Sequence, residues 1–228
     1  AGKGRETETF LYYLCGDNVI SGEIMELAVK IVGLYDGKPK AELSIREIAK
    51  RLKATYSFVY AAVDKMAKEG VIRVAVKGRA KMCSLNLRND KARALLAVYS
   101  VSRKDEFLKK NRLVGELLGE FVSRVAGEDV YSIVLFGSYA KGLASDASDV
   151  DLLVIGASKA KLDGKVDAEA NSLEARYGKE VNAVVIDKAM FLKSLRSEGV
   201  TAVKEALADH VVLSGFERFW ELVKEGLG

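Results

Sequence analysis

The sequence predicts an α+β protein of two domains, a small helical domain with a basic hairpin and a larger domain with a mixed sheet and helices, joined by a helical linker. Two observations predict this. Helical apolar patterns followed by alternating strands fill residues 21–88, whereas short apolar strands and helical segments fill residues 122–228. The charge differs as well. Residues 1–120 carry 23 basic and 15 acidic side chains (net +8), and residues 121–228 carry 13 and 17 (net −4).

The expected boundaries follow these patterns. We expect an N-terminal extension over residues 1–20, the small basic domain over 21–88 and the linker over 89–121. The sheet of the second domain is expected over 122–188, and a C-terminal helical part of the same domain over 189–228. With 228 residues, of which 49% are hydrophobic, each domain can bury its own core.

Three helices are expected at the start of the basic domain. The first covers residues 23–35 and ends before a turn that contains the only proline. Ser44 is the expected N-cap of the second helix, IREIAKRL, with Glu47 three residues on as in a capping box. Ser57 is the expected N-cap of the third helix, FVYAAVDKMAKEG. A glycine ends that helix.

A β-hairpin is predicted next, in VIRVAVKGRAKMCSLNL. Its two alternating strands flank a Lys-Gly-Arg turn at residues 77–79, so the tip of the hairpin is cationic. Helix, helix-turn-helix and basic hairpin in this order resemble a winged-helix DNA-binding domain over residues 21–87.

The winged-helix resemblance implies binding to double-stranded DNA, with the third helix in the major groove. Four residues of that helix lie off its apolar stripe and would face bases or phosphates: Ser57, Tyr60, Ala61 and Lys65. Three hairpin cations would contact the phosphate backbone: Lys77, Arg79 and Lys81. The alternatives are that these cations only solvate a small domain, and that Tyr60 is a packing residue.

A helical connection is expected over residues 90–125, which lack proline. Its apolar series is Leu113, Leu117, Leu118, Phe121, Val122 and Val125. This pattern predicts one long helix or a helix pair, and any apolar surface left uncovered would allow a homodimer.

The run VLFGSYAKGLASDASDVDLLVI contains the main candidate site. Gly137 and Ser138 directly follow a buried strand, and a short helical turn over residues 139–143 would offer free N–H groups to a phosphate. Asp149 and Asp151 stand one residue apart at a second strand, so their side chains point the same way. Two carboxylates at this spacing can share divalent cations.

This run resembles the signature of the nucleotidyltransferase superfamily related to DNA polymerase beta, in its minimal prokaryotic form. The resemblance covers residues 122–187 and implies that a nucleoside monophosphate passes from a nucleoside triphosphate to a hydroxyl group, with release of pyrophosphate. Asp149 and Asp151 would hold two Mg²⁺ (or Mn²⁺) ions about 3.5–4 Å apart. Gly137 and Ser138 would approach the triphosphate, and Lys141 would add positive charge unless it is a solvated surface lysine.

The same resemblance implies a third carboxylate on a later strand, expected at residues 180–186. Asn182 stands at that position, and an amide cannot accept the proton of an attacking hydroxyl group. Asn182 is therefore a candidate for substrate binding only. Glu180 lies two residues earlier on the same face and is the candidate catalytic substitute, or else a solvated residue at the start of the strand.

The C-terminal part is expected to contain helices over residues 189–197 and 200–209, a short strand over 211–213 and a closing helix over 216–225. Phe219 and Trp220 of the closing helix are expected in the core. His210 is the only histidine, so no His-based triad or zinc site can be built. We expect it to be structural.

Localisation in the cytoplasm, without a membrane partner, is the expectation. No apolar run reaches the roughly eighteen residues that span a bilayer, and no signal-peptide pattern opens the chain. Cys15 and Cys83 lie far apart and lack metal-ligand spacing, which fits a reducing compartment.

Three classes of function fit the sequence. The first is a DNA-bound nucleotidyltransferase, whose acceptor is nucleic acid, protein or a small molecule. The second is a winged-helix transcription regulator whose transferase domain is catalytically degenerate and only binds nucleotide or mediates assembly. The third is an antitoxin-like protein that silences a partner by adding nucleotides. The intact Gly-Ser and Asp-x-Asp motifs favour the first class, and Asn182 favours the second.

Overall fold

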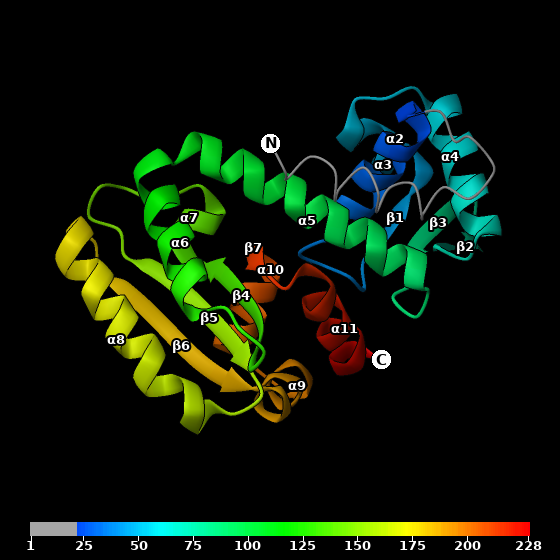
Figure 1. The fold of residues 1–228 in the computed structure, drawn as a ribbon. Coiled ribbons are helices and arrows are strands. Elements are labelled where there is room, and N and C mark those ends of the chain that lie inside the picture. The colour runs from blue at the N-terminus through cyan, green and yellow to red at the C-terminus, as the bar shows by residue number, and fades with distance from the viewer. Residues whose placement is uncertain (1–21) are drawn as a thin grey trace. The chain divides into compact units, whose positions relative to one another are not determined.

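The computed structural model describes residues 22–228, which form two compact units. One unit contains residues up to Tyr35 and Pro39–Leu95, and the other contains Asp36–Lys38 and Leu96–Gly228. Figure 1 shows the order of the elements, and both units combine helices with a β-sheet. The α+β class expected from the sequence is therefore confirmed. The expected N-terminal extension, with Cys15, lies outside the described residues.

The first unit contains helices α2 (Gly22–Gly33), α3 (Ile45–Leu52) and α4 (Tyr56–Lys68). Its antiparallel sheet has the strand order β1-β3-β2 and consists of β1 (Glu42–Ser44), β2 (Ile72–Lys77) and β3 (Ala80–Leu85). The three predicted helices and the hairpin are present, and β1 was not predicted. The core includes Ile31, Val32, Ile48, Val59 and Val63, all less than 2% exposed.

The N-terminal caps of the two central helices differ from one another. The Ser44 side chain accepts a hydrogen bond from the backbone N–H of Glu47 (3.1 Å), so the predicted cap of α3 is confirmed. The prediction for α4 was wrong, because its N-cap is Thr55 and the helix starts at Tyr56. Ser57 lies within the first turn. Two hydroxyl residues close together made the start ambiguous, and the Thr55 side chain makes no capping hydrogen bond.

The predicted helical connection is a helix pair, α5 (Asp90–Lys110) and α6 (Arg112–Val125). The apolar face of α6 is rotated by one position at its start relative to the prediction. Val114 is buried, whereas Leu113 is 54% exposed. The rest of the predicted stripe is buried or partly buried, with Leu117, Leu118 and Phe121 in the core.

The second unit is built around a four-stranded mixed sheet with the strand order β6-β5-β4-β7. Its strands are β4 (Val130–Phe136), β5 (Val150–Gly156), β6 (Val181–Asp187) and β7 (Val211–Ser214). Strands β5 and β6 are parallel, and the other pairs are antiparallel. The helices are α7 (Gly137–Lys141), α8 (Lys159–Tyr177), α9 (Lys188–Arg196), α10 (Ala202–Ala208) and α11 (Phe216–Leu227). Helix α8, which joins the parallel strands, was not predicted.

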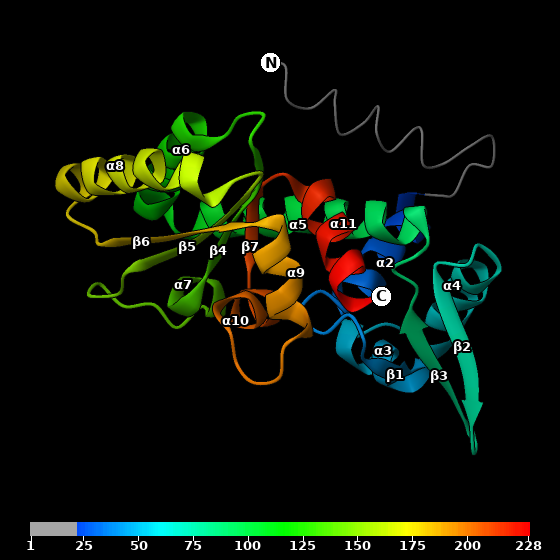
Figure 2. The ribbon, with the colours of Figure 1, turned by 90° about the horizontal axis from the view of Figure 1, so that it is seen from below.

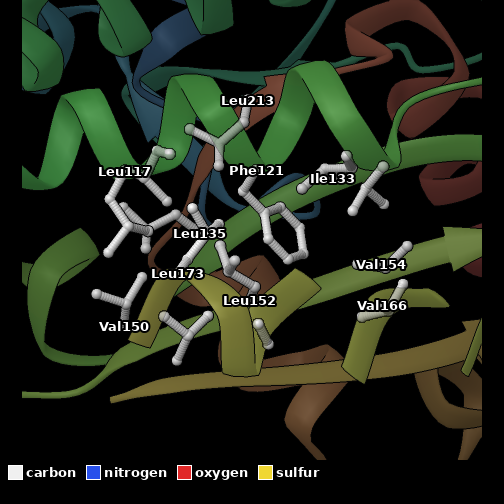
Figure 3. Packing of buried hydrophobic residues seen from close by; sticks show 14 of the residues in the cluster. Leu117, Phe121, Ile133, Leu135, Val150, Leu152, Val154, Val166, Leu173 and Leu213 are labelled. Carbon is white, nitrogen blue, oxygen red and sulfur yellow. The ribbon is translucent and has the colours of Figure 1, made fainter. Parts of the chain in front are cut away.

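Helices cover both faces of this sheet, as Figure 2 shows. On one face, α6 and α8 pack on alternate residues of β4 and β5, including Ile133, Leu135, Leu152 and Val154 (Figure 3). Helices α9, α10 and α11 lie on the other face and contact β4, β5 and β6. Because a strand alternates its side chains, Asp149 and Asp151 lie on this second face.

The predicted core aromatics of α11 are buried, with Trp220 at 0% and Phe219 at 1% exposure. The Trp220 indole Nε1 donates a hydrogen bond to the Ser100 hydroxyl (3.1 Å). His210 is also buried, with Nδ1 3.1 Å from the carbonyl oxygen of Leu207 and Nε2 3.4 Å from the Asp36 carboxylate. Its contacts are those of the structural residue that the sequence predicted. No helix of the described residues has the length and apolar character that crossing a membrane requires.

Phe121 and Leu113 give a matched test of the core. Phe121 is fully buried under the sheet, so Phe121→Ala should lower the free energy of unfolding by about 3–5 kcal/mol. Leu113 lies on the same helix but is exposed, and Leu113→Ala should change it by less than about 0.5 kcal/mol. Urea unfolding of the full chain measures both values. Equal losses would contradict the observed rotation of α6.

Candidate active site

The two aspartates of the Asp-x-Asp motif lie at the start of β5, on the face covered by α9, α10 and α11. Val150 between them is fully buried on the opposite face, against α6 and α8. Asp149 is exposed and Asp151 is half-buried. In the sheet, Asp151 pairs with Phe136 of β4 on one side and with Asn182 of β6 on the other. The motif is therefore held between the Gly-Ser turn and the strand that carries Asn182.

Gly137 brings the Gly-Ser turn directly against Asp151. A Cβ atom on Gly137 would lie 2.0 Å from Asp151 Oδ2 and 2.9 Å from its carboxyl carbon. The backbone also has φ +70° there, in the left-handed region that favours glycine. Only glycine therefore allows this turn and this carboxylate to occupy neighbouring positions.

Asn182 occupies the neighbouring position on β6 and contacts the first aspartate. Its amide Nδ2 donates a hydrogen bond to Asp149 Oδ2 at 2.9 Å. This bond orients the Asp149 carboxylate. Glu180 precedes β6 and is exposed, and its backbone carbonyl accepts a hydrogen bond from the N–H of Val150 (2.8 Å). The structure thus brings both residues of the predicted third strand beside the motif.

Negative charge dominates the surroundings of Asp151. Burial raises the pKa of this carboxyl above its usual range, and the nearby charges of Asp149, Glu205 and Glu180 raise it further. The nearby charge of Lys141 has the opposite effect and lowers this pKa. Positive charge brought to the site would therefore counteract this rise and favour the ionised form of Asp151.

Ser138 and Lys141 lie on the short helix α7 that follows the Gly-Ser turn. Lys141 is exposed, near enough to Asp151 to favour its ionised form. Lys141 also lines a pocket of about 300 Å³ with residues of α5 and the start of β7. An anion bound beside the motif would therefore meet positive charge.

The oxygen atoms at this site are those that Mg²⁺ prefers. Within residues 22–228, no group of three or more His, Cys, Asp or Glu side chains is arranged to hold a metal ion. Mg²⁺ is, however, commonly bound through one or two carboxylates, with phosphate oxygens and water completing its coordination. Asp149 and Asp151 fit such an ion, because they supply two carboxylates with an excess of negative charge.

The sequence did not identify Glu205 as a neighbour of the motif. Glu205 is an exposed residue of α10. From the sequence alone, Glu205 has the pattern of a solvent-exposed residue on an amphipathic helix. Its proximity to the motif depends on how α10 packs on β4. No local pattern could have revealed it.

The candidate DNA-contact residues of α4 are accessible. Ser57 and Tyr60 are exposed and Lys65 is partly buried, whereas Val59 and Val63 on the opposite side are buried. Tyr60 is 37% exposed, and its ring lies 6.0 Å from that of Tyr56. The surface of α4 thus combines aromatic and polar groups.

The hairpin cations are also exposed, but two of them have partners. Lys77 donates to Glu42 Oε2 at 2.5 Å. Lys81 donates to the Tyr60 hydroxyl at 2.8 Å and lies over the Tyr60 ring, 4.7 Å from its centroid. This hydrogen bond raises the pKa of Lys81, which remains charged at neutral pH. Arg79, at the turn, forms no ion pair with any residue in 22–228.

The second unit is similar to known proteins. Residues 114–213 match the family model described as "Nucleotidyltransferase domain". Two Methanocaldococcus jannaschii proteins are each 30% identical to this chain. "Putative protein adenylyltransferase MJ1305" aligns over 118 residues, 48% of this chain and 78% of that protein. "Putative protein adenylyltransferase MJ0604" aligns over 88 residues, 39% of this chain and 84% of that protein.

Solved structures are more distant. A chain from a toxin–antitoxin crystal structure with AMP-PNP has 19% identity and a TM-score of 0.33, covering 48% of this chain and 82% of that one. This similarity is too low to bear on the function of the present chain.

Substitutions at two glycines distinguish the effect of the Asp151 contact on stability from the effect of backbone strain. Gly137 and Gly142 have φ of +70° and +69°, but a Cβ on Gly142 would meet no atom within 4 Å. Gly142→Ala should cost only the left-handed conformation, about 1–2 kcal/mol. Gly137→Ala should cost about 1–3 kcal/mol more, because its Cβ collides with Asp151. Urea unfolding tests this, and equal losses would contradict the close packing.

Proposed function

Because this chain belongs to the nucleotidyltransferase domain family, we propose that it transfers AMP from ATP to a hydroxyl group of a protein. Nucleotidyl transfer follows from the family. AMP as the group and protein as the acceptor are supported by the two relatives named as protein adenylyltransferases. The observation that carries the proposal is the packing of the Asp151 carboxylate against Gly137, which joins the Asp-x-Asp motif to the Gly-Ser turn.

Each residue near this contact has a role in the proposal. Asp149 and Asp151 hold Mg²⁺ or Mn²⁺, which would stabilise negative charge on the attacking and leaving oxygens when bound. Ser138 and the backbone of Gly137 contact the triphosphate. Lys141 adds positive charge beside it. Asn182 orients Asp149 through the 2.9 Å hydrogen bond.

AMP transfer is tested with ATP labelled on the α-phosphate, Mg²⁺ and the full chain together with candidate acceptor proteins. Label should become covalently attached to protein. Asp149→Asn and Asp151→Asn should each reduce it at least about 100-fold, because both remove charge that holds the cation. Asp163→Asn is the matched control, since Asp163 lies on α8 on the other side of the sheet and pairs with Lys159. Transfer that survives both motif substitutions would contradict the proposal.

DNA binding by the first unit is the second part of the proposed function. Three helices and a basic hairpin in this order resemble a winged helix, and α4 with the hairpin presents Ser57, Tyr60, Lys65, Lys77, Arg79 and Lys81. Arg79 supports this proposal most directly, because it is exposed at the turn without an ion-pair partner in residues 22–228. Phosphate groups of double-stranded DNA would supply one. The domain would then bring the transferase to DNA or to a DNA-bound acceptor.

Binding to a DNA duplex should weaken steeply as salt increases, because phosphate contacts release counterions. Arg79→Glu should weaken binding to all sequences alike and reduce the slope of log K against log salt by about 1. Lys30→Glu is the control, since Lys30 is exposed on α2 and pairs with Glu26. Fluorescence anisotropy over a salt series measures the slopes. The same slope in both variants would contradict the assignment of the hairpin.

A further inference from the structure

Helix α4 presents aromatic rings to solvent on the side away from its buried stripe. The buried residues are Val59, Ala62, Val63 and Met66. Tyr56, at 49% exposure, and Tyr60 lie one helical turn apart on the exposed side, with ring centroids 6.0 Å apart. Ala61 is exposed next to them. Apolar groups that gather on a surface in this way mark a site of interaction.

The neighbouring hairpin extends this surface and adds positive charge to it. Helix α4 contacts β2, and Figure 2 shows the helix beside the hairpin. The Lys81 ammonium group donates a hydrogen bond to the Tyr60 hydroxyl and lies over the Tyr60 ring. Val76 is opposite Lys81 in the β2–β3 register, so its exposed side chain lies on the same face of the hairpin. The surface formed by helix and hairpin is therefore apolar, with a cation among the apolar groups.

The charge of the surrounding segment restricts the kind of ligand. Residues 44–93 contain 13 Lys and Arg but only 4 Asp and Glu. Asp64 is the one acid within α4, and it pairs with Lys68 at 2.7 Å. Apolar groups surrounded by a surplus of positive charge fit a ligand that is anionic and also offers apolar groups. Duplex DNA meets both conditions through its phosphates and its base edges.

The side chains of α4 also restrict which bases it can read. In the major groove, Arg or Lys reads guanine and Asn or Gln reads adenine. Helix α4 contains no Arg, Asn or Gln, and its two lysines lie in its last turn. Base edges are contacted by the N-terminal residues of a recognition helix, which here include Tyr56 and Tyr60. The apolar group that a base pair offers in this groove is the thymine C5-methyl group.

We propose that Tyr56, Tyr60 and Ala61 recognise thymine through its C5-methyl group, so that the first unit prefers duplex DNA that contains A·T pairs. The inference rests on the DNA binding proposed above and adds a base preference to it. The rings would contact methyl groups in the major groove, and the hairpin cations would contact phosphates. Lys81 closes one face of the Tyr60 ring to a stacked base. Contact between a methyl group and the ring edge does not need that face.

Two duplexes of identical sequence and charge test this inference, one with thymine and one with deoxyuridine at every A·T pair. Deoxyuridine lacks only the C5-methyl group. The full chain should bind the thymine duplex at least about fourfold more tightly, which is the effect of burying one methyl group. Fluorescence anisotropy at a fixed salt concentration measures both values of Kd.

Substitutions that remove or retain a ring connect this preference to α4. Tyr56→Ser and Tyr60→Ser should each reduce the ratio of the two affinities at least about twofold, because methyl contacts are lost. Tyr56→Phe and Tyr60→Phe should keep the ratio, because the ring remains. These side chains are exposed, so the variants should remain folded.

Phe58→Ser is the matched control for the loss of an exposed ring. Phe58 is 40% exposed on the same helix, but it stands two residues from each tyrosine. That spacing places it about 160° around the helix from their side chains. The variant should therefore keep the thymine preference of the parent protein.

Four outcomes would overturn the inference. Equal affinities for the two duplexes would do so while leaving DNA binding intact. A preference that persists in both Tyr→Ser variants would reflect the shape of the duplex instead of contact with the rings. Tighter binding to the single strand than to the duplex would indicate base stacking. If the parent protein binds no duplex of either kind, the proposed DNA binding itself fails, and this inference fails with it.

Discussion

The absence of a side chain at Gly137 is the constraint on which the site depends. Asp151 Oδ2 lies 2.0 Å from where a Cβ of residue 137 would be, and the backbone turns there with φ +70°. Because Phe136 pairs with Asp151 across β4 and β5, the turn and the carboxylate belong to one hydrogen-bonded ladder. The distance from the Gly-Ser turn to the Asp-x-Asp motif is thus fixed by the backbone rather than by flexible side chains.

The same sheet decides which way the acids point. Val150, Leu152 and Val154 bury their side chains under α6 and α8, so the alternating residues of β5 face the other way. A shift of the β5 register by one residue would point the two aspartates toward Phe121. It would also move Val150, Leu152 and Val154 to the opposite face of the sheet. The hydrophobic packing that stabilises this unit therefore also orients the two carboxylates.

The sequence predicted the features that depend on neighbouring residues. The Ser44 cap, the hairpin, the strands around the Asp-x-Asp motif and the burial of Trp220 all follow from local pattern. Helix α8 was missed, although Leu162, Val166, Ala170 and Leu173 recur at helical spacing, because charged residues surround them. The α4 cap and the face of α6 were each misplaced by one or two residues, which is the usual uncertainty at helix ends.

What the sequence could not predict depends on distant segments. Lys77 on β2 donates a hydrogen bond to Glu42 on β1, and β3 lies between these two strands in the sheet order β1-β3-β2. Strand β1 has only three residues. The position of Glu205 depends on how α10 packs on β4, and its neighbour Asp151 lies on another strand. Sequence patterns describe one element at a time, so they identify an exposed glutamate without identifying what it faces.

The acidic side chains around Asp151 lower the stability of the folded protein, as is expected at a site that binds a cation. Because burial and like charges raise the pKa of Asp151, its ionised form is less favourable in the folded protein than in the unfolded chain. The folded state is therefore less stable at neutral pH than with this group protonated, and its stability falls as pH rises through the raised pKa. A bound cation favours the ionised form and removes this penalty. The carboxylates are thus arranged for a positively charged ligand rather than for stability of the free protein.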